Sequence, residues 1–470
     1  MTVGLEMRHP SPTAARRRPP ADRFRRRAAI ADLLVIAVWA SGAVAASLFL
    51  ASGGVGGFGT LADTITSVGI LSGLVGTDFV LVMLVLAARI PGLDRTIGHD
   101  RAIALHRRLG KPALYLLLAH GALLLLGYGL SDGVDPVSEF WALMSVPDLP
   151  LAVLAMGLMI TVVVTSLVAV RRRFPYEFWY VVHLLSYAAV LTALPHQLSA
   201  GSVLVNGTVE RVYWTALYVL ALGSIVVFRF ASPLIRSLRH ELRVERVEWI
   251  APDVVSIHLR GRDLRRLRAE GGQFFTWRFW QRGMWWHTHP ISLSAVPTDR
   301  EARITIRVLG AGTKRIAAVR PGTAVSFSGP YGLFTDAGRT APKLAIVAAG
   351  IGVTPVRALL EGSDLAPGEA TVLLRSSTAD ALYLGDEMER LAELRGARLY
   401  TMIGARPPGT DTWMSAVDRE RGVTLQSAFP DLRDSDLYVC GPPEWTDLVA
   451  ADARRAGLGE HRIHVERFDW

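Results

Sequence analysis

The segment Ala104–Gly121, with the sequence ALHRRLGKPALYLLLAHG, carries a histidine near each end of a largely apolar stretch. His106 and His120 are 14 positions apart. On an α-helix this spacing corresponds to about 21 Å along the axis and to nearly four whole turns. Both imidazoles are therefore expected on the same side of one membrane helix, at two different levels.

A second pair of histidines lies downstream in Phe178–Leu198. His183 and His196 are 13 positions apart, which on an ideal helix leaves them about 140° apart around the axis. Pro195 removes a backbone donor and can bend the helix so that both side chains face one channel. A single membrane histidine usually bonds a neighbouring helix. Two matched pairs instead predict two stacked haems, each bound by two neutral imidazoles.

Six apolar stretches are long enough to cross a membrane, for which about 20 residues are needed. These predicted spans are Leu33–Ser52, Val68–Ile90, Lys111–Leu130, Leu149–Val170, Phe178–Leu198 and Val212–Phe228.

Basic residues gather at alternate ends of these spans. The loops Gly53–Asp63 and Ser131–Asp148 contain no lysine or arginine, whereas Arg171–Arg173 and the basic tail lie on the opposite side. The positive-inside rule then predicts an integral protein of the plasma (cytoplasmic) membrane with both termini in the cytoplasm. Residues 1–28 are expected to form a disordered basic cytoplasmic tail.

Composition narrows the class of protein further. Half of the 470 residues are hydrophobic, and the net charge of +9 is explained by membrane topology, so no nucleic-acid partner is expected. Cys440 is the one cysteine, which excludes a disulfide framework and, with no CxxCH motif, a covalently attached haem. Asp78 lies inside a predicted span, where a functional carboxylate and a hydrogen bond to a neighbouring helix are both open.

After His240 the pattern changes to short β-type runs, which predict a small antiparallel barrel up to about Phe334. Its most informative stretch is HTHPISLSAVP, in which Ser292 stands two positions after Pro290 and can bond a flavin edge. In IRVLGAGTKR, an arginine and a glycine-bearing turn suit a pyrophosphate. The candidate residues here are His289, Pro290, Ser292, Arg307, Gly312 and Thr313.

The last part of the chain has the pattern of a dinucleotide-binding domain. In KLAIVAAGIGVTPVRALLEG an apolar strand runs into a glycine turn and a helix, whose N-terminus offers donors to phosphate. A second strand ends at Arg375 and Ser376, where an adenosine ribose would lie. Arg375 favours NADPH over NADH, because no carboxylate of a NAD-type ribose clamp follows this strand.

The chain from about Ile30 onward resembles the ferric reductase/NADPH oxidase superfamily, in which a six-helix haem domain is fused to a ferredoxin–NADP reductase-like module. The resemblance is carried by H-x13-H, H-x12-H, HPxS, GPYG, GIGVTP, CGPP and the HVE ending, in that order. Three departures stand out: Ala348 and Ala349 replace a frequent glycine, Trp445 replaces a frequent methionine, and two residues follow Phe468.

The resemblance implies a role for each matching residue. His106 and His183 would hold the inner haem, and His120 and His196 the outer haem. Cys440 and Glu466 would flank the hydride path near Ser292, and Phe468 or Trp470 would shield the flavin. The expected nicotinamide-dinucleotide contacts are Gly350, Gly352, Thr354, Pro355, Gly441 and Pro442.

These observations predict a multi-domain fold: an all-α six-helix transmembrane haem bundle, an antiparallel β-barrel FAD domain and an α/β Rossmann-like NAD(P) domain. The expected boundaries are 29–232, 236–338 and 340–470. By resemblance, electrons pass from NAD(P)H through FAD and two b-type haems to an external acceptor, most simply a ferric chelate. Superoxide production from O₂ remains an alternative, as does a histidine-lined transporter with a fused reductase.

Overall fold

The computed structural model describes residues 20–199, 207–407 and 409–468. The chain divides into two compact units, of which one is Ile30–Ser232 and the other contains Pro233–Trp470. Each unit has its own hydrophobic core.

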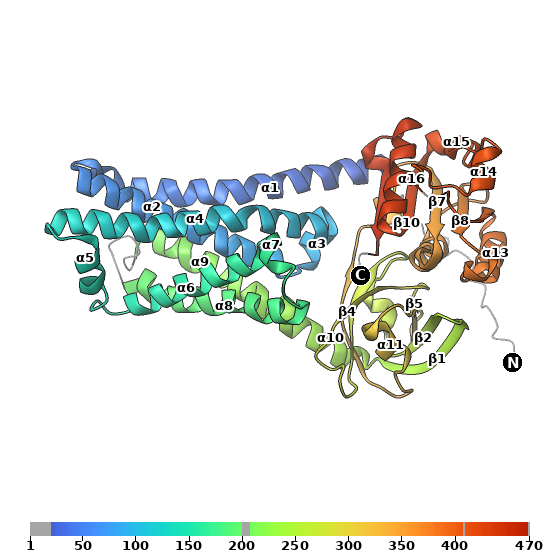
Figure 1. Cartoon of the computed structure of the whole chain (residues 1–470), viewed down its shortest axis with the longest axis horizontal. Helices are drawn as coiled ribbons and strands as arrows, with labels where there is room; N and C mark the ends of the chain where they lie inside the picture. The colour runs from blue at the N-terminus through green and yellow to red at the C-terminus, as the bar shows by residue number, and fades with distance from the viewer. Residues whose placement is uncertain (1–19, 200–206, 408, 469–470) are drawn as a thin grey trace. The chain divides into compact units, whose positions relative to one another are not determined.

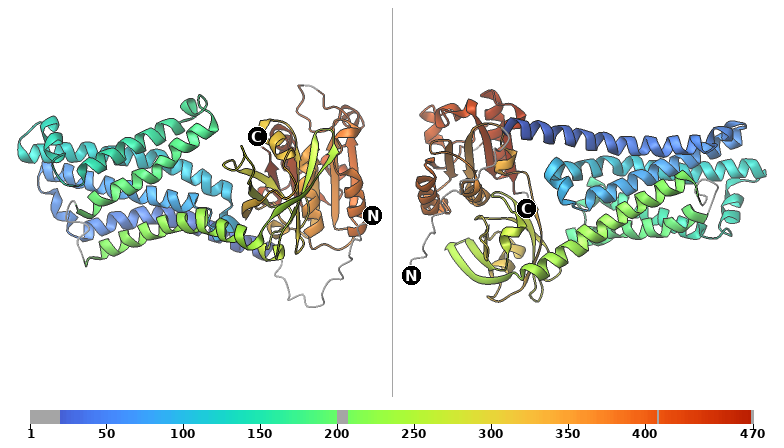
Figure 2. Two further views of the ribbon diagram at one scale, coloured as in Figure 1. Left: turned by 90° about the horizontal axis from the view of Figure 1, so that it is seen from below. Right: turned by 180° about the vertical axis from the view of Figure 1, so that it is seen from behind.

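The first unit is a bundle of long apolar helices, which run side by side in the two views of Figure 2. The described residues contain six helices long and apolar enough to cross a membrane, which confirms the predicted number. They are α1 (Pro20–Ala51), α2 (Leu61–Ala87), α4 (His99–Asp132), α6 (Leu149–Ser166), α8 (Tyr176–Ser199) and α9 (Val209–Ser224). The short helices α3 (Pro91–Ile97), α5 (Pro136–Leu143) and α7 (Val168–Arg171) connect them.

Two boundaries differ from the expectation. Residues 1–28 are the stretch expected to be disordered. Helix α1 begins at Pro20, so residues 20–28 of this stretch are helical, and residues 1–19 lie outside the described part. The last membrane helix continues through a π-helical segment, Ile225–Ala231, into α10 (Ser232–His240). Apolar length predicts where a helix lies in the bilayer, whereas its polar ends continue beyond it and carry no hydropathy signal.

A strip of glycines lets α2 pack closely against α4; both helices are labelled in Figure 1. A Cβ atom at Gly69 would lie 3.1 Å from side-chain atoms of Leu123 and Leu124, and one at Gly76 would lie 3.1 Å from Leu117. Small residues at a membrane helix interface allow the backbones to approach and maximise dispersion contacts.

Asp78 on α2 is fully buried and bonds two other helices. Its Oδ1 atom accepts hydrogen bonds from Ser41 Oγ on α1 at 2.7 Å and from Tyr213 Oη on α9 at 2.8 Å. Of the two roles expected for Asp78, the structure shows the hydrogen bonds between helices.

The second unit begins with two three-stranded antiparallel sheets, in the orders β1-β2-β5 and β4-β3-β6. Strand β3 alternates between partly buried and buried positions, which directs Phe275, Trp277 and Phe279 into the core. The strands are β1 (Arg243–Ala251), β2 (Val254–Arg260), β3 (Phe274–Phe279), β4 (His289–Ser292), β5 (Glu301–Arg307) and β6 (Val325–Tyr331), with helix α11 (Ala311–Ala317) after β5.

A five-stranded parallel sheet follows, in the order β11-β10-β7-β8-β9. Helices cover it, so its strands β8 and β10 are buried at every position, and their middle residues are mostly apolar. The strands are β7 (Lys343–Ala349), β8 (Ala370–Ser376), β9 (Arg398–Ile403), β10 (Ser435–Gly441) and β11 (Ile463–Arg467). The helices are α12 (Val353–Gly362), α13 (Gly385–Arg395), α14 (Ala416–Glu420), α15 (Leu425–Ala428) and α16 (Pro443–Arg455).

The predicted fold class is confirmed: an apolar helical bundle, an antiparallel β part and a doubly covered parallel sheet. The residue numbers given for the domain boundaries remain predictions.

Replacement of Asp78 tests whether its hydrogen bonds stabilise the bundle. Asp78→Ala removes an acceptor from two partly buried hydroxyl groups, and we expect a loss of about 1–3 kcal/mol in the free energy of unfolding. Asp78→Asn keeps an acceptor oxygen in the same place and should lose less. Thermal unfolding of the detergent-solubilised protein measures both, and equal stability of Asp78→Ala and wild type would contradict a structural role.

Candidate functional site

Both histidines of α4 are held by backbone carbonyl groups of α2. His106 Nδ1 lies 3.1 Å from the Met83 carbonyl oxygen, and His120 Nδ1 lies 2.9 Å from that of Gly69. A carbonyl oxygen only accepts, so Nδ1 carries the hydrogen in each ring. This tautomer leaves Nε2 with its lone pair available to a metal, which is the usual arrangement of a metal-binding histidine.

Helix α8 supplies the opposing histidine at the first level. The ring centres of His183 and His106 are 6.1 Å apart. Two imidazoles on opposite sides of one metal ion have centres roughly 6 Å apart, because each metal–nitrogen bond is about 2 Å long. The pair therefore fits a single iron between them. Ser166 Oγ lies 3.3 Å from His183 Nδ1 and can fix the orientation of that ring.

The second level contains His120 and His196. The buried Nδ1 atom of His196 has no hydrogen-bond partner of good geometry within the described part of the chain. A Cβ atom at Gly73 would lie 2.4 Å from His120 Nδ1, so the absence of a side chain at this position makes room for the imidazole. The four histidines thus fit the donor set that two bis-histidine haems need.

The candidate flavin residues lie on β4, at the end of β5 and in the first turn of α11. Ser292 is buried at the end of β4, next to Phe274 of β3. A Cβ atom at Gly312 would lie 3.6 Å from His289 Cε1, which brings the turn next to β4. Thr313 Oγ1 accepts hydrogen bonds from the backbone N–H groups of Leu309 and Gly310 and thereby holds the turn.

Two residues of this region have electrostatic surroundings that the sequence did not predict. Burial, with a contribution from the charge of His287, lowers the pKa of His289 to about 4, so this imidazole is neutral at pH 7. Arg307, expected to contact a pyrophosphate, forms an ion pair with Asp253 at 2.7 Å. The hydrogen bond to Asp253 raises the pKa of Arg307.

The candidate hydride site gathers at the carboxyl ends of three neighbouring parallel strands, where ligands bind in such sheets. In the registers of β10 with β7 and β11, Cys440 lies beside Ala348 and Glu466. Gly350 has a φ of +55°, and a Cβ atom at Gly352 would lie 2.3 Å from the Cys440 carbonyl oxygen. The turn after β7 therefore lies directly against the end of β10.

Cys440 is fully buried, and its thiol is neutral. Burial, together with the nearby charge of Glu466, raises the pKa of the thiol well above its ordinary value. An uncharged thiol is a poor nucleophile. The side chain is thus suited to packing against a neighbour rather than to covalent chemistry.

The helix after the glycine turn contains the next two candidates. Thr354 is buried, and its hydroxyl donates to the Ile351 carbonyl oxygen at 3.0 Å, while Pro355 lies in the first turn of α12. Gly441 is required because a Cβ atom there would lie 2.9 Å from the ring of Trp445. Pro442 is the residue before α16.

Arg375 and Ser376 are buried at the end of β8 and engage the backbone. The guanidinium of Arg375 donates to the carbonyl oxygens of Ser376, Met402 and Gly404. Ser376 Oγ donates to the Thr378 carbonyl oxygen at 2.7 Å. Burial lowers the pKa of Arg375. Sequence reasoning did not predict this use of Arg375, because two of its three acceptors lie on or just after the neighbouring strand β9.

Of the two candidates for shielding the flavin, Phe468 is among the described residues and Trp470 is not. Phe468 packs against the buried cluster that contains Cys440. Trp470 lies outside the described residues.

Comparison with known proteins agrees with this architecture. Residues 72–194 match the family model of the ferric reductase like transmembrane component, and residues 346–450 match the oxidoreductase NAD-binding domain. A ferredoxin–NADP reductase B of Sorangium cellulosum is 32% identical over 174 residues, which are 34% of this chain and 68% of that protein.

Two further similarities are more distant. A probable metalloreductase of Yarrowia lipolytica is 24% identical over 279 residues, which cover 58% of this chain and 47% of that protein. The solved flavohaem-like FAD/NAD binding domain of nitric oxide dioxygenase from Vibrio cholerae is 20% identical, with a TM-score of 0.40 over 49% of this chain and 99% of that domain.

The membrane bundle matches a ferric reductase component, and the parallel sheet matches a reductase NAD-binding domain, in the order that the sequence motifs predict. The chain therefore belongs to the ferric reductase/NADPH oxidase superfamily and is an NAD(P)H-dependent membrane reductase.

Proposed function

We propose that this protein carries electrons from cytoplasmic NAD(P)H through FAD and two b-type haems to a ferric chelate on the other side of the membrane. The observation that carries the proposal is the pair of α4 imidazoles whose Nδ1 atoms bond carbonyls of α2. The ring of His183, 6.1 Å from that of His106, completes one ligand pair. His120 and His196 form the second pair.

The cofactors supply the redox chemistry: a flavin accepts a hydride and returns single electrons, which haem iron can take one at a time. The protein supplies their positions. The α2 carbonyls orient the imidazoles of α4. The positive-inside rule, applied to the basic ends of the helices, supports a cytoplasmic location for both termini. A membrane potential of about 100 mV, negative inside, then favours outward movement of each electron by about 2.3 kcal/mol.

At the hydride site, the side chains act by position and charge. Ser292 would offer a hydroxyl group to the flavin edge, and the small neutral side chain of Cys440 would pack beside the nicotinamide. Glu466, next to Cys440 across β10 and β11, would stabilise positive charge on the donor ring.

The preference for NADPH depends on Arg375. Its guanidinium is used by backbone carbonyl groups, so contact with a 2′-phosphate requires the side chain to leave them. NADPH remains the proposed donor, and a comparison of NADPH with NADH in the wild-type protein decides between the two.

The first prediction concerns the outer haem. Gly73→Ala places a Cβ atom 2.4 Å from the present position of His120 Nδ1, so the imidazole must move and lose its bond to Gly69. We expect loss of about half of the haem, as for His120→Ala. The pyridine haemochrome assay on the purified protein measures the haem content. Gly121→Ala is a matched control, since nothing lies within 4 Å of a Cβ atom there. Full haem content in both Gly73→Ala and His120→Ala would contradict the assignment.

The second prediction concerns hydride transfer. Cys440→Ala removes the side chain beside the nicotinamide, and flavin reduction should slow by ten-fold or more, on the order of 1.4 kcal/mol in the barrier. Stopped-flow absorbance gives the rate, and bound FAD and both haem signals should stay intact. Val439→Ala, at the adjacent fully buried position of β10, is the control for lost core volume. A rate that falls equally in both variants would make Cys440 a core residue only.

The third prediction identifies the acceptor. Membranes that contain the protein, supplied with NADPH, should reduce a ferric chelate at a rate that superoxide dismutase does not change. Inhibition by the dismutase would instead show that O₂ is the acceptor and superoxide the product. Membranes with no b-type haem spectrum would favour the histidine-lined transporter.

A further inference from the structure

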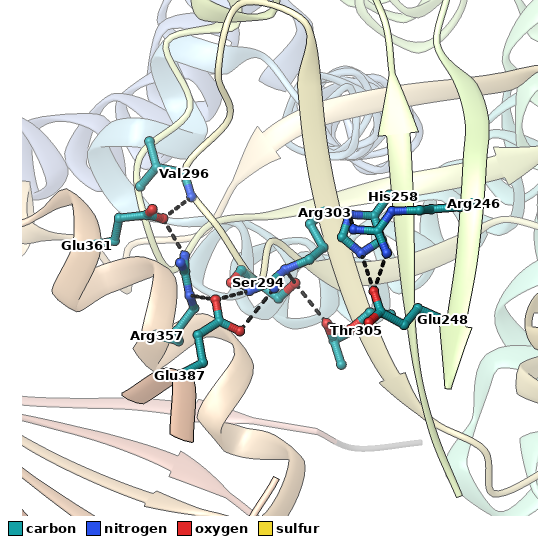
Figure 3. Close-up of polar contacts among 11 residues, drawn as sticks. Arg246, Glu248, His258, Ser294, Val296, Arg303, Thr305, Arg357, Glu361 and Glu387 are labelled. Carbon is teal, nitrogen blue, oxygen red and sulfur yellow. Dashed lines mark hydrogen bonds and ion pairs between the residues drawn. The ribbon is translucent and has the colours of Figure 1, made fainter. Parts of the chain in front are cut away.

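A chain of charged side chains joins the antiparallel barrel to the parallel-sheet part within the second unit (Figure 3). Arg303 on β5 donates to both carboxylate oxygens of Glu387 on α13, at 2.9 and 3.0 Å. Arg357 on α12 donates to the same carboxylate at 2.7 Å and also pairs with Glu361. We call these four residues, Arg303, Glu387, Arg357 and Glu361, the charged array.

The charged array also holds the segment that follows the candidate flavin strand β4. The guanidinium of Arg303 donates to Ser294 Oγ at 3.1 Å and to the Ser294 carbonyl oxygen at 2.9 Å. The carboxylate of Glu361 accepts a hydrogen bond from the Val296 backbone N–H at 2.6 Å. Ser294 and Val296 follow Ser292 by two and four positions. Charged side chains of the barrel and of α12 therefore both hydrogen-bond this segment.

Two glycines bring the same parts into direct backbone contact. A Cβ atom at Gly271, which precedes β3, would lie 1.8 Å from the Ala358 carbonyl oxygen of α12. A Cβ atom at Gly362, the last residue of α12, would lie 3.1 Å from a methyl carbon of Val296. Without side chains at these positions, the barrel and α12 can approach to backbone distance.

The charges of the array are largely removed from water. The exposed fractions of the side chains are 10% for Arg357, 17% for Arg303 and 23% for Glu387. Burial alone would raise the pKa of Glu387, but the bond from Arg303 and the charges of both arginines lower it below its ordinary value. Loss of this carboxylate charge would leave Arg303 without its counter-charge and Arg357 paired with Glu361 alone.

We propose that the charged array is a positioning device that fixes β4 relative to α12. Helix α12 begins directly after the Gly350–Gly352 turn, so the array sets the distance between the flavin and nicotinamide sites. A misplacement of about 1 Å between reacting groups can slow a reaction by roughly a hundred-fold. The inference that the charged array affects hydride transfer rests on the proposed function. The inference that it holds Val296 in place does not.

Glu387→Gln in the full-length protein tests the proposal, with Glu389→Gln, an exposed position on the same helix, as the matched control. We expect the limiting rate of flavin reduction by NADPH to fall at least ten-fold in Glu387→Gln, at unchanged FAD and haem content. Hydrogen exchange in the peptide that contains Ser294 and Val296 should quicken by about ten-fold. Glu389→Gln should match wild type in both measurements.

A double-mutant cycle separates positioning from general destabilisation. Arg303→Gln should reproduce the slow flavin reduction, and its combination with Glu387→Gln should add little, because both remove the same contact. Wild-type reduction rates in both single variants, or a fall in rate that only follows lost FAD, would overturn the proposal. If the flavin of the wild-type protein is not reduced by NAD(P)H at all, the proposed function fails. Unchanged hydrogen exchange at Val296 in Glu387→Gln would independently overturn the positioning role of the charged array.

Discussion

The hydrogen bonds that the imidazoles of His106 and His120 donate to two α2 carbonyl oxygens are the constraint on which the membrane unit depends. In hydrocarbon no water can orient an imidazole, so a neighbouring backbone must do so. A helix carbonyl has a second lone pair to offer, but only to a ring that comes very close. Gly73 of α2 allows that approach for His120. At this level, helix packing and the orientation of the imidazole follow from one glycine-lined contact.

Much of the fold could be predicted because its signals are local. The six spans, the alternating strand β3 and the continuous apolar strands of the parallel sheet each follow from hydrophobic pattern within a short window. The histidine spacing is also local, since both members of each pair lie on one helix. The helix ends were less predictable, as the early start of α1 at Pro20 shows.

The side-chain partners could not be predicted in the same way, because they come from distant parts of the chain. Arg303 and Glu387 are 84 positions apart, and Asp78 and Tyr213 are 135 apart. Arg375 and Arg307 were expected to meet phosphate, yet in the structure they bond backbone carbonyls and Asp253. In a sequence, an arginine that binds phosphate cannot be distinguished from one that donates to backbone carbonyl groups at the end of a strand. Only the tertiary neighbours distinguish them.

The position of Cys440 has a consequence for the durability of the protein. Oxidants attack the thiolate, and they need access to the sulfur. The side chain of Cys440 has no exposed surface in the described chain, and its proton is retained because burial and Glu466 both disfavour the anion. Since the chain has no second cysteine, it offers no exposed thiol to peroxide or disulfide exchange. A reductase built this way can work beside partly reduced oxygen species without thiol damage to itself.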